Sequence, residues 1–163
     1  MVAEFNGFQI NPIHNGDAWK LCDFMVANAD RFKRYFPKTL EQNLNPNLSQ
    51  LFVETKVKQF KTKVEFLFTL KHSETRELAG LVYIKELNWD KKQGEFAYCI
   101  GYRFKGQKLI SKAVESLSKY AFTDLGKILL AKQLKSKLTP LVIDRIKRGM
   151  GVLLIVFGAV LML

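Results

Sequence analysis

Three segments between residues 64 and 102 have the composition of β-strands and are separated by short polar turns. They are rich in Val, Ile, Phe and Tyr, the residues that fit a pleated, half-buried surface. The segments are Val64–Leu70, Leu78–Leu87 and Glu95–Tyr102, and the turns are His72–Glu77 and Trp89–Gln93. Turns this short join neighbouring strands in the antiparallel sense, because a parallel pair needs a crossover connection of about a dozen residues or more. The sequence therefore predicts an antiparallel meander.

Helical periodicity, with apolar residues at steps of three and four, is found on both sides of these strands. The further predicted elements are a strand Phe8–Ile13, a helix Ala18–Ala29, a basic and aromatic turn ending at Pro37, a helix Leu48–Phe60 and a helix Gln107–Phe122. The resulting order is β-α-α-β-β-β-α. It predicts an α+β fold in which helices pack on the meander.

Composition narrows the class of protein further. The 163 residues suit one domain, and 48% of them are hydrophobic, which is ample for a packed core and excludes a disordered chain. The net charge of +11 suits an anionic partner. No nucleic-acid-binding motif accompanies it, so nucleic acid is not expected as a partner. Cys22 and Cys99 have no metal or redox spacing, which favours a reducing, cytoplasmic compartment without a metal site. Cys99 is predicted to be a core residue, and His14 and His72 to lie at the surface.

The stretch from Glu95 to Val114 carries the most informative combination of residues. A strand runs into a basic, glycine-containing loop, and the loop opens an amphipathic helix. The first N–H groups of a helix have no intrahelical partner, and together with the helix dipole they favour an anion such as phosphate. Arg103, Lys105 and Lys108 add positive charge, and Gly106 lets the backbone approach a ligand closely. The sequence therefore predicts a phosphate-binding loop.

The loop resembles the acyl-CoA pyrophosphate loop of the GNAT superfamily, whose pattern is Gln/Arg-x-x-Gly-x-Gly/Ala. Here the pattern falls on Arg103-Phe104-Lys105-Gly106-Gln107-Lys108. The flanking segments Tyr98–Tyr102 and Tyr120–Gly126 are similar to the branch of ribosomal-protein N-terminal acetyltransferases. One position departs from the pattern, because Lys108 stands where the family has Gly or Ala. Its long side chain either crowds the pyrophosphate or contacts it as a point charge.

The resemblance implies a GNAT-like antiparallel or mixed sheet flanked by helices over residues 1–126. It also implies acetyl-CoA as acyl donor and an amine acceptor, either a protein N-terminus or a small amine. In the family the amine attacks the thioester directly, while backbone donors of a strand stabilise the oxyanion. The implied cofactor-binding residues are Tyr98, Ile100, Arg103, Phe104, Lys105, Gly106, Gln107, Lys108 and Leu109.

Glu95 is the candidate catalytic base. In the family a carboxylate, or a water held by one, deprotonates the acceptor amine, and Glu95 lies on the strand that leads to the loop. A solvated glutamate at the start of a strand explains the same position equally well. Phe32, Tyr35 and Phe36 either line an acceptor site or pack in the core.

Residues 127–163 form a second predicted region, a basic linker followed by an apolar C-terminal helix. They include seven basic residues and one acidic residue, and they end in fifteen uncharged residues, Gly149–Leu163. This tail resembles the last helix of lysine-exporter-type amino-acid exporters. The strands and helix that complete a GNAT fold are not recognisable in it, so the transferase domain is predicted to be truncated at its C-terminal end. Fifteen helical residues span ~22 Å, less than the ~30 Å of a bilayer core.

Two functions follow from these patterns. The first is an acetyl-CoA-dependent N-acetyltransferase with a cytoplasmic domain. The second is a catalytically inactive GNAT remnant, or a fusion with a transporter helix, that associates with a membrane through residues 140–163. In that case the basic cluster of Arg145, Lys147 and Arg148 lies on the cytosolic side. Binding of acetyl-CoA separates the two.

Overall fold

The computed structural model describes residues 1–91 and 93–125. Its strands are β1 (Ala3–Phe5), β2 (Phe8–Pro12), β3 (Phe66–His72), β4 (Leu78–Asn88) and β5 (Gln93–Ile100). Its α-helices are α1 (Ala18–Ala27), α2 (Ala29–Tyr35), α3 (Pro37–Glu41), α4 (Pro46–Thr62) and α5 (Leu109–Tyr120). Two 3-10 turns, Asn15–Asp17 and Tyr102–Phe104, precede α1 and α5, and a π-helical turn spans Ala121–Leu125. Residues Met1–Tyr120 form one compact unit, and Ala121 begins a second.

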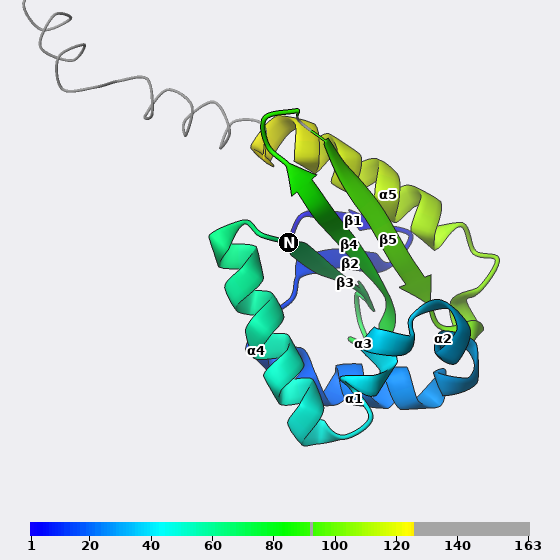
Figure 1. Cartoon of the computed structure of the whole chain (residues 1–163). Coiled ribbons are helices and arrows are strands. Elements are labelled where there is room, and N and C mark those ends of the chain that lie inside the picture. Colours follow the sequence, from blue (N-terminus) through cyan, green and yellow to red (C-terminus); the bar gives the residue numbers. More distant parts are fainter. Residues whose placement is uncertain (92, 126–163) are drawn as a thin grey trace, which may run out of the picture. The chain divides into compact units, whose positions relative to one another are not determined.

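The predicted meander is confirmed. The five strands form one antiparallel sheet in the order β1-β2-β3-β4-β5, so each strand pairs with its neighbour in sequence (Figure 1). Phe66 of β3 pairs with Ile84 of β4, and Leu81 of β4 pairs with Cys99 of β5. Among the described strands, β1 and β5 are therefore the edges of the sheet.

The β1–β2 hairpin is not predicted from the sequence, which indicates only the second of its two strands. Its turn consists of Asn6 and Gly7, both with positive φ, 49° and 74°. Two consecutive left-handed residues are typical of a type I′ turn, for which Asn-Gly is the preferred sequence. The dipeptide was available in the sequence, but a strand of three residues is too short for an alternating pattern to mark it.

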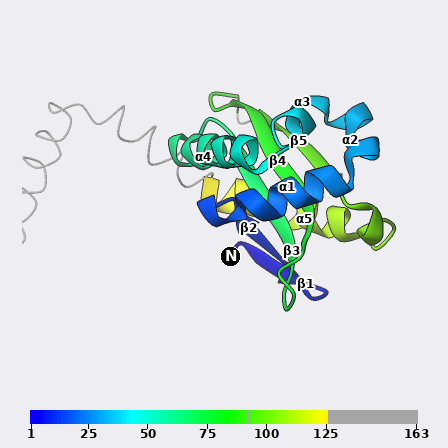
Figure 2. The same ribbon diagram turned by 90° about the horizontal axis from the view of Figure 1, so that it is seen from below.

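Four helices cover one face of the sheet. Leu67, Leu81 and Tyr83 point into a core with apolar side chains of α1 to α4, among them Leu21, Phe32 and Val53. Figure 2 shows α1 lying across the strands. Because successive side chains of a strand alternate between faces, Phe68 lies on the opposite face from Leu67. There it meets the ring of Tyr120, at the end of α5, edge-on at 5.8 Å.

The prediction of a turn over the basic and aromatic segment ending at Pro37 is wrong, because this segment contains α2 and the start of α3. Proline here begins a helix rather than ending one, since the first helical position needs no N–H donor. The same arrangement places Pro46 at the start of α4, where Asn45 Oδ1 accepts from the Leu48 N–H at 3.0 Å. Phe32 is buried beside Phe24, and this contact fixes α2 on α1.

The boundaries of β5 and α5 also differ from the prediction. β5 begins at Gln93 and ends at Ile100, and α5 begins at Leu109. The predicted apolar helix of residues 140–163 and the basic linker lie outside the described residues. Within residues 1–91 and 93–125, no helix combines the length and apolar character needed to cross a membrane.

Candidate active site

The outer edge of β5 presents a row of backbone groups without a strand partner in the described part of the chain. Gly101 N–H donates to Ala79 O at 2.8 Å, so this pair of residues is hydrogen-bonded across β4 and β5. In an antiparallel pair, hydrogen-bonded and non-hydrogen-bonded residues alternate. The N–H and C=O groups of Ile100, Tyr98 and Phe96 therefore point away from β4, toward the open edge. Two of these residues, Tyr98 and Ile100, are predicted cofactor-binding residues.

Two contacts hold the segment after β5 in place. Tyr102 N–H donates to Oδ1 of Asn28, at the junction of α1 and α2, at 2.9 Å. The ring of Phe104 meets the ring of Phe8 edge-on at 5.7 Å. The loop is therefore docked on β2 and on the α1–α2 junction before any ligand binds. The side chain of Phe104 is engaged in this contact, so only its backbone is left to face a ligand.

Two left-handed residues shape the loop between this turn and α5. Gly106 has a φ of 83° and Lys108 a φ of 57°. A Cβ atom built on Gly106 would meet no atom within 4 Å, so the space beside this glycine is open. Lys108 stands where the GNAT pattern has Gly or Ala, and its positive φ is a conformation that favours glycine. A lysine in this conformation carries backbone strain that glycine does not.

The amide groups of the loop are available to a ligand. Among the described residues, the N–H groups of Gly106, Gln107 and Lys108 donate to no acceptor. The carbonyl of Lys108 accepts the first bond of α5, from Lys112 N–H at 3.3 Å, so the free amides lie directly at the N-terminus of this helix. Leu109 is buried, and only its backbone can face a ligand. Such a set of amides fits the oxygens of a phosphate.

Three cationic side chains belong to the same loop as these amides. Arg103, Lys105 and Lys108 are all exposed to solvent. The Arg103 guanidinium, 77% exposed, donates to Oε1 of Glu77 at 2.8 Å. The Gln107 side chain donates to the carbonyl of Arg103 at 3.3 Å and so lies along the loop. The structure brings the six residues of the predicted phosphate loop into one turn beside the open edge of β5.

Glu95 lies farther back on β5, on the face covered by α1 to α4. It shares this face with Ala97 and Cys99, which pack in the core. The Glu95 side chain is 53% exposed, and its Oε1 lies 3.3 Å from Nζ of Lys85 on β4. A carboxylate that reaches solvent beside the strand can accept a proton, but Glu95 also forms an ion pair with Lys85.

The other side chains near this face are structural. Burial raises the pKa of the Cys99 thiol to about 12, so it stays protonated near neutral pH and is a poor nucleophile, as predicted for a core residue. Phe32 is buried, and the ring of Phe36 stacks on Tyr83 with centroids 6.4 Å apart. Of the three aromatic residues considered for an acceptor site, only Tyr35 is largely exposed.

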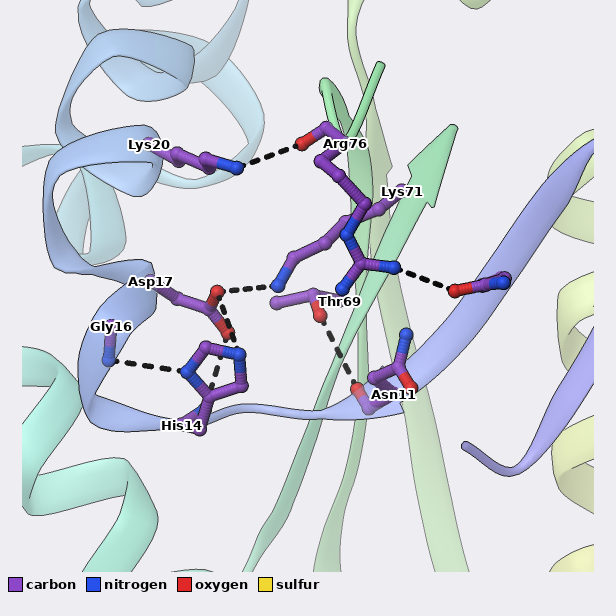
Figure 3. Close-up of polar contacts among 9 residues, drawn as sticks. Asn11, His14, Gly16, Asp17, Lys20, Thr69, Lys71 and Arg76 are labelled. Atoms are coloured by element: carbon purple, nitrogen blue, oxygen red, sulfur yellow. Dashed lines mark hydrogen bonds and ion pairs between the residues drawn. The ribbon is translucent and has the colours of Figure 1, made fainter. Parts of the chain in front are cut away.

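A second polar cluster, between the β2–α1 corner and β3, was not anticipated from the sequence (Figure 3). Lys71 Nζ donates to Oδ1 of Asp17, and both side chains are 2% exposed. His14 N–H donates to Oδ2 of Asp17 at 3.2 Å, and Gly16 N–H donates to Nδ1 of His14 at 3.1 Å. Because Nδ1 accepts, the imidazole proton is assigned to Nε2, which lies 3.4 Å from Asp17. His14 remains largely exposed, as predicted.

Comparison with known proteins agrees with this arrangement of sheet, loop and helix. The sequence matches a protein-family model described as "Acetyltransferase (GNAT) domain" over residues 8–141. Among curated proteins, none matches the sequence. The ribosomal-protein-S5-alanine acetyltransferase from Vibrio fischeri is similar in structure, with a TM-score of 0.69 and 18% identity, over 76% of this chain and 68% of that chain.

Two further similar structures contain cofactor. RimL, a ribosomal L7/L12 α-N-protein acetyltransferase in complex with coenzyme A, has a TM-score of 0.67 and 11% identity, over 73% of this chain and 66% of that chain. MccE, a microcin C7 self-immunity acetyltransferase in complex with acetyl-CoA and AMP, has a TM-score of 0.65 and 18% identity, over 75% of this chain and 66% of that chain. The chain thus spans about two thirds of the length of each, and at these identities the similarity concerns the fold. Through the match over residues 8–141, the chain belongs to the GNAT acetyltransferase family.

Proposed function

We propose that this protein is an acetyl-CoA-dependent N-acetyltransferase that acts on an amine acceptor. The observation that carries the proposal is the continuity of two sets of unpaired backbone groups. The open edge of β5, at Tyr98 and Ile100, leads within a few residues to the free amides of Gly106, Gln107 and Lys108. An elongated ligand with a hydrogen-bonding arm and a phosphate group would satisfy both sets at once.

The loop would hold the pyrophosphate of the acyl donor. Its free amides and the N-terminus of α5 offer donors to phosphate oxygens, and Arg103, Lys105 and Lys108 offer charge. The open space beside Gly106 allows close approach of a ligand. Lys108 would contact the phosphate from the rim of the loop or crowd it, and the K108G variant described below separates these roles. The residues present therefore fit a CoA ester.

Transfer would take place beside the open edge of β5. A neutral acceptor amine attacks the thioester carbonyl carbon, the C–N bond forms, and the C–S bond breaks to release the CoA thiolate. Glu95 would accept the proton that the amine loses, directly or through a water. This proton would then pass through solvent to the leaving thiolate, so that Glu95 is restored as a carboxylate. Backbone N–H groups of β5 would donate to the carbonyl oxygen as it gains negative charge. Because Lys85 shares the carboxylate, Glu95 has to reorient or act through water.

The acceptor is proposed to be a protein N-terminus or a small amine. RimL and the Vibrio fischeri enzyme are ribosomal-protein acetyltransferases by name, whereas MccE confers self-immunity to microcin C7. An amine is the feature that a ribosomal-protein N-terminus and a small acceptor would share. The exposed Tyr35 on α2 and the carboxylate of Glu95 on β5 are groups that such an acceptor would meet.

Calorimetric titration of the full chain with acetyl-CoA tests the proposal. We expect saturable binding that is lost when the ligand is replaced by S-acetylpantetheine, which lacks the phosphates. Release of CoA thiol is then followed with two acceptor panels, peptides with free N-termini and small polyamines. Binding with transfer supports the enzyme, and binding without transfer to either panel counts against it. Failure to bind acetyl-CoA overturns the proposal.

Membrane association through residues 140–163 is a separate proposal, supported by the sequence alone. The uncharged run Gly149–Leu163 follows the basic residues Arg145, Lys147 and Arg148 directly. We expect deletion of residues 138–163 to move the protein from the membrane fraction to the supernatant after cell lysis. If the full-length chain is already monomeric in the supernatant without detergent, the proposal is wrong.

A further inference from the structure

The ion pair between Glu77 and Arg103 joins the β3–β4 turn to the phosphate loop. The guanidinium Nη1 lies 2.8 Å from Oε1 of Glu77, and the two residues are 26 positions apart in sequence. Arg103 is the first residue of the GNAT loop pattern. One of the three cations of the predicted phosphate loop is therefore already bound to a carboxylate of the same chain.

The turn that carries Glu77 is held in place by other contacts. His72 N–H donates to Glu77 O at 2.9 Å, and Ser73 N–H donates to Gly7 O at 2.7 Å. Arg76 Nη1 donates to Oε1 of Gln9 on β2 at 2.6 Å. The backbone of Glu77 is thus fixed to the sheet, and its carboxylate is a counter-charge at a defined place beside the loop.

The phosphate loop does not depend on this ion pair for its position. The bond from Tyr102 to Asn28 and the ring contact of Phe104 with Phe8 dock the loop on both sides of Arg103. The pair itself is open to solvent, with side chains 77% and 41% exposed. Exposed pairs of this kind contribute little to stability. Their effect on a charged ligand is different, because an arginine that binds a carboxylate has fewer donors left for a phosphate.

We propose that Glu77 is an internal competitor of the acyl donor's phosphates for Arg103 and so lowers the affinity of the free protein for CoA esters. The inference rests on the proposed function, since it assigns a regulator to the same loop. On binding, Arg103 exchanges the Glu77 carboxylate for phosphate oxygens, with no covalent change. The Glu77–Arg103 ion pair thereby keeps the affinity for CoA esters below the value that the donors of the loop would give without Glu77.

The test compares the wild-type chain with Glu77→Gln in calorimetric titrations with CoA. We expect the Kd for CoA to fall about two- to fivefold, the range that an exposed ion pair can supply. Glu74→Gln is the matched control, because it removes the same charge from the same exposed turn without a contact to Arg103. In an Arg103→Gln background, the Glu77→Gln effect should disappear, because the competed donor is gone.

The outcomes are distinct. An unchanged or raised Kd in Glu77→Gln overturns the inference while leaving the proposed function intact. Raised affinity of equal size in Glu74→Gln, or persistence of the effect without Arg103, shows a general charge effect and also overturns it. Absence of CoA binding by both wild type and Glu77→Gln overturns the proposed function together with the inference.

Discussion

Two polar regions of this protein contrast in how their hydrogen-bonding groups are used. At the β2–α1 corner, Asp17 and Lys71 are buried and paired, and His14 supplies a further donor. In the loop between β5 and α5, amide groups from Gly106 to Lys108 have no acceptor among the described residues. The first region is closed on itself, whereas the second leaves its donors open to solvent.

The contrast separates structural chemistry from binding chemistry. A buried charge without a partner destabilises the folded protein. Asp17 and Lys71 are each other's partner, so this pair needs no ligand to neutralise it. Open amides at a helix N-terminus cost little in water, but they give a phosphate several donors at once. Changes at the corner should therefore alter stability, and changes at the loop should alter ligand affinity. Each of the following variants tests that division.

The largest effect is expected for Lys71→Met. Removal of the ammonium leaves the Asp17 carboxylate buried without its ion-pair partner, which should lower the free energy of unfolding by about 3–5 kcal/mol in urea titrations. The double variant Asp17→Asn/Lys71→Met, which carries no charge at the corner, should recover much of this loss. Lys20→Met is the control, because its exposed ammonium donates, within the described part of the chain, only to the carbonyl of Arg76 at 3.4 Å.

If Lys71→Met unfolded at the same urea concentration as Lys20→Met, the corner would not be a stabilising site. A folded Lys71→Met protein that lost CoA binding would remove the division between the two regions.

Next in size is the effect of Glu95→Gln on the chemical step. If Glu95 accepts the amine proton, kcat should fall about 100-fold or more, while the Kd for acetyl-CoA stays unchanged. Stopped assays of CoA release with the best acceptor measure the first quantity, and calorimetry measures the second. Glu86→Gln is a matched control, since Glu86 lies 3.7 Å from the same Lys85. Equal kcat values for the two variants would assign Glu95 the role of a solvated surface residue.

A smaller effect, on affinity, is expected for Gly106→Val. A β-branched residue disfavours a φ of 83°, so the loop should shift and the Kd for CoA should rise about tenfold, or about 1.4 kcal/mol. Gly7→Val provides the control, because Gly7 also has a positive φ and open space beside it, but it lies in the β1–β2 turn. Both variants should lose stability, and only Gly106→Val should lose affinity. Equal losses of affinity would argue against the phosphate loop.

The smallest effect is expected for Lys108→Gly. Relief of the left-handed lysine should raise the free energy of unfolding by about 0.5–1 kcal/mol, the gain being limited by the greater freedom of glycine in the unfolded chain. Lys63→Gly should give a similar gain, because Lys63 has a φ of 60° at the end of α4. A change in CoA affinity is expected only for Lys108→Gly. A higher affinity for CoA in Lys108→Gly identifies crowding by the lysine, and a lower affinity identifies a contact between the lysine and phosphate.

The regions also differ in how far the sequence predicts them. The meander and the phosphate loop are built from consecutive residues, so alternation, turn residues and one glycine mark them directly. The Asp17–Lys71 pair joins positions 54 apart, and no local pattern records that distance. Lys71 even interrupts an apolar strand, where a lysine would be expected to face solvent. The sequence predicts a turn over the basic and aromatic segment ending at Pro37, whereas this segment contains most of α2, and Pro37 begins α3.

Within the site, position along the chain was predictable but side-chain partners were not. Spacing placed Arg103 at the start of the loop, yet its bond to Glu77 depends on the way the β3–β4 turn folds back. The same is true of Glu95, whose pairing with Lys85 follows from the register of β4 and β5. Contacts of this kind require the sheet register, which a single sequence does not specify.

The register of β2 on β3 has a consequence for the order in which the protein folds. Pro12 pairs with Phe68, so this contact closes a long loop, whereas β3, β4 and β5 are joined by short turns. Loop closure costs entropy, and distant pairings slow folding. During synthesis the β1–β2 hairpin emerges before β3, so it has no sheet to join until β3 has left the ribosome. We therefore expect the meander to assemble early and the buried corner to close last.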